Sequence, residues 1–461
     1  MRPSTLRLPD RQADLPAGRL GPPRAAPLPP PAVPPARPPP EQELVQLWHG
    51  QHLPPDALAT RRGELLRVVY RGRLPRGPGP DFRDAVIEGP EGELWHGDVE
   101  VHVRASAFRL HGHGRDPAYD GVVLHLVWED DEDEDTLLPC GRRVAVVALA
   151  PWFQSRRQEL ARLLKRPDAW REPCFSALTR LGPEAAGRIL DRLGDLRFRQ
   201  KTEAFRRVLP AASNLPAGQA GLPPAASAAD QVPYAAVLEA LGYGGHREAF
   251  ARLARELPYH RLRAATAGRP GAEAAAHLET MLLAAADLAS FPAPALWRPR
   301  CQRPANHPRR RLAGAARLLA RAPLGLAAYA RACLPAEVSP AAAVRAWTVA
   351  GEGSASPALI GRGRAVEILV NAVLPFLAAG GAGADAPLHE RALGLFRRLP
   401  AAGGYGVTAH LERALAPNGG RRLTTSARRQ QGLLYLLHRY CRQGGCAQTG
   451  ARPGASACPL S

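Results

Sequence analysis

The strand-forming patterns of this chain are confined to one stretch, and that confinement limits the possible folds more than any other feature. Between Leu65 and Leu149, short β-branched and alternating runs follow one another, as is typical of strands. After Pro151, segments rich in Ala, Leu and Arg recur with helical periodicity, interrupted by Pro and Gly. We therefore predict an α+β protein in which a small mixed β-sheet module precedes a mostly α-helical region.

The predicted module spans residues 41–150 and opens with a helix at Glu41–Trp48, where apolar positions have helical spacing before Pro54 and Pro55. Strands are predicted at 65–70, 85–88, 94–103, 121–128 and 143–149, with a hairpin turn at 89–92 and a polar connection at 105–120. The third strand alternates cleanly between valines and polar residues. One of its faces is therefore expected in the core, and the other is polar.

The remaining chain divides by composition. Residues 1–40 are Pro-rich, which predicts a disordered tail that buries no core. Residues 151–461 form the helical region, and Gly/Ala-rich loops at 211–229 and 380–387 leave open whether it has one lobe or two. Apolar runs such as Ile368–Ala379 are shorter than a membrane span, and Pro375 interrupts that one. Scattered cysteines and the absence of a signal-peptide pattern indicate a reduced, cytoplasmic setting.

The formal net charge of +19 is unevenly distributed. Residues 41–150 carry an acidic excess, whereas residues 151–461 carry a large basic excess. This division predicts a polyanion partner, nucleic acid, held mainly by the helical region. Its basic cluster of Arg303, Arg309 and Arg310 is either a phosphate-contacting loop or a helix N-terminal surface. Arg-biased codon usage on a solvated surface is the alternative, because only Lys165 and Lys201 are lysines. The oligomeric state stays open.

One constellation carries chemistry. Asp81 stands just before the second predicted strand, and Glu100 and His102 lie on the polar face of the third. Carboxylates on neighbouring strands can share Mg²⁺ or Mn²⁺, with the carbonyl of Val101 as a further oxygen ligand. Such an ion polarises a phosphodiester and activates water, which His102 would orient. The plain alternative is a turn-capping Asp81 and a strand-face Glu100 paired with Arg104.

The order of these elements resembles the PD-(D/E)XK nuclease superfamily, whose fold is restriction-endonuclease-like, over residues 41–150. The resemblance implies that Asp81 and Glu100 bind the metal. It also implies an acid from the opening helix, for which Glu43 is the first candidate and Glu64 the second. The family usually has Lys at the last motif position, where this chain has His102.

A closer resemblance is to a bacterial family called domain of unknown function number twenty-eight fifty-one, and it extends to the end of the chain. The residues that carry it are Gly79–Phe82, Val99–Val103, His111–His113, Asp116, Tyr119, Val123–Val127, Arg303–Pro308, Gly361–Arg364, Asn371, Pro375, Gln431–Gly432 and Tyr440–Cys441. That resemblance implies no activity. We predict a Mg²⁺-dependent nuclease or related phosphodiesterase from the residue chemistry alone.

Two other functions remain open. Without catalysis, the same fold would be a degenerate nuclease that binds nucleic acid or acts as a scaffold. His111 and His113 could instead form a zinc site for a hydrolase, with further ligands at His125, His96 or Cys140. We favour His111, His113 and Asp116 as active-site neighbours that contact a phosphate or proton, and His125 as a core residue.

Two further features receive no site role. The acidic run Glu129–Asp135 is expected to be a solvated loop. Cys441 and Cys446 could begin a metal knuckle, but buried or free thiols are the favoured interpretation.

Overall fold

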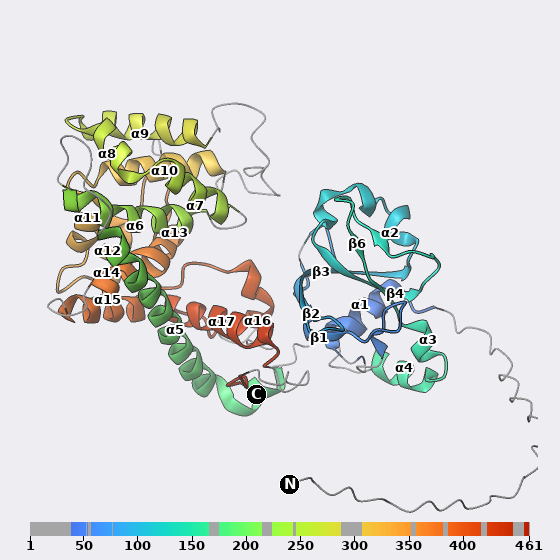
Figure 1. The fold of residues 1–461 in the computed structure, drawn as a ribbon. Coiled ribbons are helices and arrows are strands. Elements are labelled where there is room, and N and C mark those ends of the chain that lie inside the picture. Colours follow the sequence, from blue (N-terminus) through green and yellow to red (C-terminus); the bar gives the residue numbers. More distant parts are fainter. Residues whose placement is uncertain are drawn as a thin grey trace, which may run out of the picture. The chain divides into compact units, whose positions relative to one another are not determined.

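The computed structural model describes residues 38–460 except 52, 54–56, 76, 166–174, 214–223, 243–245, 287–306, 352–355, 381–385, 416–421 and 446–455. The predicted disordered tail, residues 1–40, lies almost wholly outside the described residues. The rest is α+β, as predicted: a curled mixed sheet comes first and a largely helical region follows (Figure 1). The domain boundaries proposed from the sequence stay predictions.

The main sheet has five strands in the order β1-β2-β3-β4-β7. Pairing is antiparallel from β1 to β3 and parallel between β3, β4 and β7. A separate antiparallel pair is formed by β5 and β6. The strands are β1 (Arg67–Tyr70), β2 (Phe82–Glu88), β3 (Leu94–Arg104), β4 (Val122–Glu129), β5 (Thr136–Leu137), β6 (Arg143–Val144) and β7 (Val146–Ala148).

The predicted fifth strand at 143–149 is therefore wrong as a single element. Its first half, β6, joins β5 outside the main sheet, and its second half, β7, pairs with β4. Between them, the carbonyl of Ala145 accepts the backbone N–H of His125. An unbroken apolar run cannot reveal this change of partner, because both halves have the same β-branched composition.

Strand β3 owes its parallel neighbour to a close approach. The N–H of Asp98 donates to the carbonyl of Gly121, just before β4 begins. A Cβ at Gly97 would lie 2.3 Å from that carbonyl oxygen. Any side chain at Gly97 would therefore push the two strands apart.

The helix α1 (Glu41–Gly50) packs on one face of the sheet. Its acidic first turn suits the helix dipole, and it ends at Gln51, whose φ of 53° is left-handed. Leu44 and Trp48 are buried with Phe82 and Val99 in one apolar cluster. That cluster also holds Phe153 and Leu163 from the next two helices, α3 (Ala150–Phe153) and α4 (Arg157–Leu164). We call residues 41–164 the sheet module.

The helical region follows, from Phe175 onward. Its main helices are α5 (Phe175–Ser213), α6 (Pro224–Leu241), α7 (Arg247–Glu256), α8 (Tyr259–Thr266), α9 (Gly271–Ala285), α10 (Pro308–Ala320), α11 (Leu326–Ala332), α12 (Pro340–Ala346), α13 (Arg362–Ile368), α14 (Leu374–Gly380), α15 (Ala386–Arg398), α16 (Ala409–Ala414) and α17 (Ala427–Arg439). Helix α5 is broken at Gly182, whose φ is 71°. The loop predicted at 211–229 is too long, because α6 already begins at Pro224.

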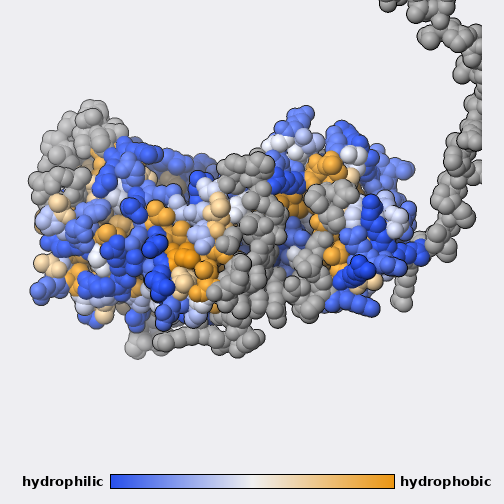
Figure 2. Space-filling view, turned by 90° about the horizontal axis from the view of Figure 1, so that it is seen from below, coloured by the Kyte–Doolittle hydropathy of each residue, from blue (hydrophilic) through white to orange (hydrophobic). Residues whose placement is uncertain are grey.

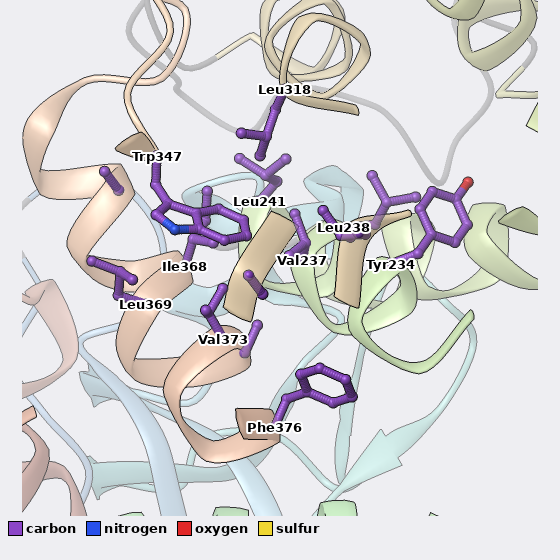
Figure 3. Packing of buried hydrophobic residues seen from close by; sticks show 14 of the residues in the cluster. Tyr234, Val237, Leu238, Leu241, Leu318, Trp347, Ile368, Leu369, Val373 and Phe376 are labelled. Carbon is purple, nitrogen blue, oxygen red and sulfur yellow. The ribbon is translucent and has the colours of Figure 1, made fainter. Parts of the chain in front are cut away.

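The largest apolar cluster holds the helical region together. Figure 3 shows side chains of α6, among them Val237 and Leu241, facing Trp347 and Ile368 across a packed interior. Each such fully buried large side chain contributes about 1.5–3 kcal/mol relative to exposure. Between α13 and α14, the chain forms one π-helical segment, η6 (Leu369–Val373).

The stretch Arg362–Gly380 is apolar and long enough, by length and composition, to pass as one membrane span. The sequence predicts no such segment, because its apolar runs are shorter than a membrane span and Pro375 interrupts this one. In the structure α13, η6 and α14 follow one another without a break, and 72% of the apolar window is buried within the protein. That burial is typical of a core helix, and the expectation of no membrane partner stays a prediction.

The sheet module and the helical region share an apolar cluster and a buried polar contact. Val69 and Tyr70 of β1 pack in one cluster with Leu411 and Leu436. The hydroxyl of Tyr70 lies 3.1 Å from Nε2 of His410. On the face seen in Figure 2, hydrophobic residues form patches within a mostly hydrophilic surface.

Candidate functional site

The β2–β3 pairing brings Asp81 and Glu100 together. Phe82 is paired with Val99, so Asp81, one residue earlier, lies opposite Glu100. The N–H of Asp81 donates to Oε2 of Glu100 at 3.1 Å. In return, the N–H of Val101 donates to Oδ2 of Asp81 at 3.0 Å. The two carboxylates predicted from the sequence to converge therefore do so.

A tight turn delivers Asp81 to this position. Gly79 has a φ of 107°, which lies in the region that favours glycine. A Cβ there would come within 2.5 Å of the guanidinium of Arg83, which is held by the carbonyl of Pro78. Glycine at position 79 is thus needed for the path of the chain before Asp81.

Burial and mutual repulsion leave both carboxyl groups reluctant to ionise. Burial raises the pKa of Asp81 to about 6, and the nearby charge of Glu41 adds to the effect. The pKa of Glu100 rises to about 9 because of burial and then of Asp81. Two carboxylates so close can both be charged at neutral pH only if a cation joins them.

A chain of buried polar groups orients His102 beside Glu100. Nε2 of His102 lies 3.6 Å from Oε1 of Glu100. Its Nδ1 lies 2.9 Å from Nε2 of His125, whose Nδ1 lies 2.7 Å from the hydroxyl of Thr136. Burial and neighbouring histidines lower the pKa of His102 to about 2, so it is neutral. The face of β3 that was predicted to be polar is polar but buried, at 4% exposure for Glu100 and 1% for His102.

His111 and His113 complete the cluster from the connection between β3 and β4. One ligand atom from each of His102, His111 and His113 lies within 4.8 Å of the others. Nε2 of His113 is 3.4 Å from Oε1 of Glu100, and its ring stacks on Tyr119 with centroids 4.1 Å apart. The same Glu100 oxygen thus faces two imidazoles.

The connection that carries these histidines is short and helical. It consists of α2 (Ala107–Leu110), η2 (His113–Arg115) and η3 (Pro117–Tyr119). The carboxylate of Asp116 caps η3 by accepting the N–H of Ala118 at 2.9 Å. Asp116 therefore stabilises the backbone of this connection as a helix cap.

The chain matches the family model described as Protein of unknown function (DUF2851) over residues 41–293. This match covers more than half of the chain. The chain belongs to this family. It has no significant match among curated proteins or among solved structures. Within this family member, the matched range contains the whole carboxylate and histidine cluster.

The acid of α1 that acts on the pair is Glu41, whereas the resemblance in sequence pointed to Glu43. The charge of Glu41 raises the pKa of both Asp81 and Glu100. The predicted Glu43 stands two residues later, about 200° further round the helix. The second candidate, Glu64, lies in an exposed turn, where its carboxylate is 3.3 Å from the hydroxyl of Thr60.

The simple alternative of an ion pair between Glu100 and Arg104 is not what the structure shows. The guanidinium of Arg104 lies 3.4 Å from the exposed carboxylate of Glu129. The neighbours of Glu100 are the imidazoles of His102 and His113. Glu100 is therefore held within the site.

The acidic run after β4 supports the site from outside. Oδ1 of Asp131 accepts the N–H of Ser106, and Oδ2 accepts its hydroxyl, at 2.9 and 2.6 Å. Glu132 accepts a hydrogen bond from Arg109 at 3.2 Å. Because these partners flank α2, the run braces the segment that leads to the histidines, a role that its sequence alone does not reveal.

Other predicted residues lie elsewhere. His96 is exposed and paired with Val86 in the antiparallel part of the sheet, and Cys140 is exposed in a turn. Neither belongs to the histidine cluster. Cys446 lies outside the described residues, so the metal-knuckle idea stays a prediction.

The basic cluster is resolved in part. Arg303 lies outside the described residues, whereas Arg309 and Arg310 begin α10. Of the two alternatives raised from the sequence, these two residues therefore form a helix N-terminal surface. Arg310 donates to the carbonyl of Pro357 at 2.8 Å. A role in binding nucleic acid stays a prediction.

Proposed function

We propose that this protein is a metal-dependent phosphodiesterase that acts on nucleic acid, a nuclease of the PD-(D/E)XK type. The observation that carries the proposal is the proximity of the two carboxylates where the start of β2 meets the middle of β3. Oε2 of Glu100 accepts the N–H of Asp81, and Oδ2 of Asp81 accepts the N–H of Val101, the residue next to Glu100. The order of the elements, with an opening helix whose Glu41 acts on the pair, supports the same conclusion.

The residues present fit a hard divalent cation. Asp81 and Glu100 offer carboxylate oxygens, and their raised pKa values mean that their ionisation is favoured when a cation binds. The N–H of Val101 points at Asp81, and a strand residue directs its N–H and carbonyl to the same edge. Val101 thereby adds an oxygen. A cation held here would polarise the phosphodiester and lower the pKa of an attacking water.

The histidines favour Mn²⁺ over Mg²⁺. Mg²⁺ prefers oxygen ligands, whereas imidazole binds the later first-row metals more strongly. Nitrogens of His102 and His113 face Glu100 at 3.6 and 3.4 Å. His102 occupies the position where the superfamily usually has Lys. A neutral imidazole there can bind a metal, and it does not supply the positive charge of a lysine.

The proposal is tested by cleavage of DNA and RNA by the purified protein with Mg²⁺ or Mn²⁺. We expect activity in the wild type and its loss in Asp81→Asn and Glu100→Gln. Asp84→Asn is the matched control, because Asp84 lies three residues away, has a φ of 61° that asparagine tolerates, and pairs with Arg73. Equal activity in all variants would contradict the proposal. Salt-dependent binding without turnover under either metal would instead indicate the non-catalytic alternative.

A zinc-dependent hydrolase is the second candidate, and the convergence of His102, His111 and His113 favours it. Three imidazoles leave an open fourth position for water, as in catalytic zinc sites. Elemental analysis of the purified protein is expected to show stoichiometric zinc that His111→Ala removes. Zinc-free protein that still cleaves with Mn²⁺ would eliminate this candidate.

A further inference from the structure

The helical region contains a cavity of about 1220 Å³ that is lined by α5, α6, α7, α13, η6 and α17. It is larger than the roughly 300–1,000 Å³ of ordinary small-molecule sites. Among the lining residues that belong to the helical region, the cationic ones are Arg197, Lys201, Arg247, Arg255 and Arg364, and the acidic ones are Glu239 and Glu367. The lining therefore has an excess of positive charge.

Neutral amide oxygens hold the cations at the bottom of the cavity. Nζ of Lys201 donates to Oδ1 of Asn371 and to Oε1 of Gln431, each at 2.6 Å. Nε of Arg197 donates to the same Gln431 oxygen at 2.9 Å. Gln431 is 1% exposed. These amide oxygens orient Lys201 and Arg197 but supply no compensating negative charge. An anion bound in the cavity would therefore favour the charged form of Lys201.

The backbone departs from regular geometry where it meets this network. Asn371 lies in η6, the π-helical segment Leu369–Val373. Its side-chain N–H₂ donates to the carboxylate and to the carbonyl of Glu367, at 2.7 and 2.9 Å. Single π-helical turns within α-helices occur frequently at functional sites. The π turn sets the position of Asn371 between Lys201 and Glu367.

Beyond Lys201, the wall that α5 forms is apolar and accessible to solvent. Ala204, Phe205 and Val208 line it, and Val208 is 51% exposed. Phe205 is half-buried, with its ring edge-on to Phe376. A ligand that contacts both the cationic side chains and the apolar wall needs an anionic group for the former and a flat apolar part that packs on the Phe205 ring. A nucleotide unit combines the two.

We propose that this cavity binds a nucleotide unit, with its phosphate among Arg255 and Arg364 and its base against Phe205. Arg255, on α7, is exposed at the lining, where a guanidinium can form paired hydrogen bonds to phosphate. The same chemistry is offered by a free nucleotide and by a nucleotide within a polynucleotide. The inference does not depend on hydrolysis at Asp81 and Glu100, because binding here needs no metal.

The test is binding to the full chain in EDTA, where metal-dependent cleavage cannot occur. Calorimetry would use adenosine 5′-monophosphate, adenosine and inorganic phosphate, and anisotropy would use a labelled single-stranded oligodeoxynucleotide of about ten residues. Binding of the monophosphate, with adenosine much weaker, identifies a free-nucleotide site. Binding of the oligodeoxynucleotide alone identifies a polynucleotide site. Either result supports the proposal if the cavity variants weaken it.

Those variants are chosen at exposed positions so that the protein still folds. Arg255→Gln removes one cation, and Ala204→Glu adds a negative charge on the apolar wall. Arg255→Gln is expected to weaken binding about tenfold, because one charge-assisted hydrogen bond is lost. Ala204→Glu is expected to weaken it because the added carboxylate repels an anionic ligand. Arg252→Gln, on the same helix and exposed, but outside the lining, is the control and should leave the dissociation constant unchanged.

Three results would overturn the inference. One is undetectable binding of every probe by wild-type protein. Another is equal binding of adenosine and its monophosphate, since the phosphate would then contribute nothing. The third is equal weakening by Arg252→Gln and Arg255→Gln, which would show attraction to overall charge. Circular dichroism of each variant distinguishes loss of binding from loss of fold.

Discussion

The sheet module and the helical region bury ionisable groups of opposite kinds. In the sheet module, Asp81 and Glu100 lie side by side, and Glu100 also faces the imidazoles of His102 and His113. In the helical region, Lys201 and Arg197 are held by amide oxygens of Asn371 and Gln431. Burial shifts the pKa values in opposite directions, upward for the carboxyl groups and downward for Lys201.

This difference indicates which kind of ion each region can bind. Burial raises the pKa values of both carboxyl groups, most strongly that of Glu100, so the sheet site is suited to a metal ion that favours their ionised form. Burial also disfavours the charged form of Lys201, and only uncharged oxygens hold it, so the cavity is suited to an anion. A phosphodiester substrate would meet a metal in one region and a basic surface in the other. The following predictions test this contrast, beginning with the largest effect.

Neutralising one carboxylate should abolish the metal-dependent chemistry. Glu100→Gln keeps the shape of the side chain but removes a metal ligand, so cleavage with Mn²⁺ should fall by about a thousandfold or more. Steady-state cleavage rates measure this effect. Arg255→Gln, in the cavity, should not change the rate of single-turnover cleavage at saturating substrate. A similar loss in both variants would contradict the division of roles.

The pH dependence of stability should have opposite signs in the two regions. The pKa of Glu100 is about 9 in the folded protein against 4.5 ordinarily. The folded state therefore keeps a proton that the unfolded chain releases, and the unfolding free energy from Glu100 falls as pH rises between about 4.5 and 9. The lowered pKa of Lys201 has the reverse effect, because the unfolded chain then binds the extra proton as pH falls below 10.5.

Thermal unfolding of metal-free protein from pH 5 to 9 measures this contrast. Glu100→Gln should flatten the decline in Tm, and Lys201→Met should steepen it. Added Mn²⁺ should raise the Tm most at high pH, where it no longer competes with protons. A Tm that rises with pH equally in wild type and Glu100→Gln would be inconsistent with these pKa shifts.

The buried hydrogen-bond chain should matter less than the ligands themselves. Thr136→Val removes the hydroxyl that lies 2.7 Å from Nδ1 of His125, and His125 in turn orients His102. We expect Mn²⁺ affinity and cleavage to fall about tenfold, as is usual for outer partners of a ligand. The control is Thr60→Val, a matched change at a residue outside the site. Equal effects would indicate a general loss of stability.

The smallest effect should distinguish the two acids of α1. Glu41 raises the pKa values of Asp81 and Glu100, so Glu41→Gln should move the acid limb of the pH–activity profile to lower pH by less than about one unit. Glu43→Gln should leave the profile in place. A shift in Glu43→Gln alone would restore the assignment first made from the sequence.

Much of the fold could be predicted because local patterns decide it. The alternation at Val99, Val101 and Val103 predicts β3. The Gly-Pro turn predicts that Asp81 lies at the start of the preceding strand, β2. Adjacent strands then bring Asp81 and Glu100 together. The order of elements was enough for this pair.

The remaining features of the fold and the sites depend on tertiary contacts that no local sequence pattern indicates. The run at 143–149 divides between two sheets, and no property of its valines indicates the division. The position of Glu41 follows from how α1 sits against β3. The convergence of Lys201, Asn371 and Gln431 joins three helices far apart in the sequence. Sequence patterns gave these residues no common site.

The most direct test of the central claim is the binding of Mn²⁺ to metal-free protein at pH 7.5, measured by calorimetry in the wild type and in Glu100→Gln. We expect saturable binding by the wild type, with proton release as the carboxyl groups ionise. We also expect that Glu100→Gln loses this binding while Asp84→Asn retains it. Indistinguishable binding in the wild type and Glu100→Gln, or none in either, would contradict the account.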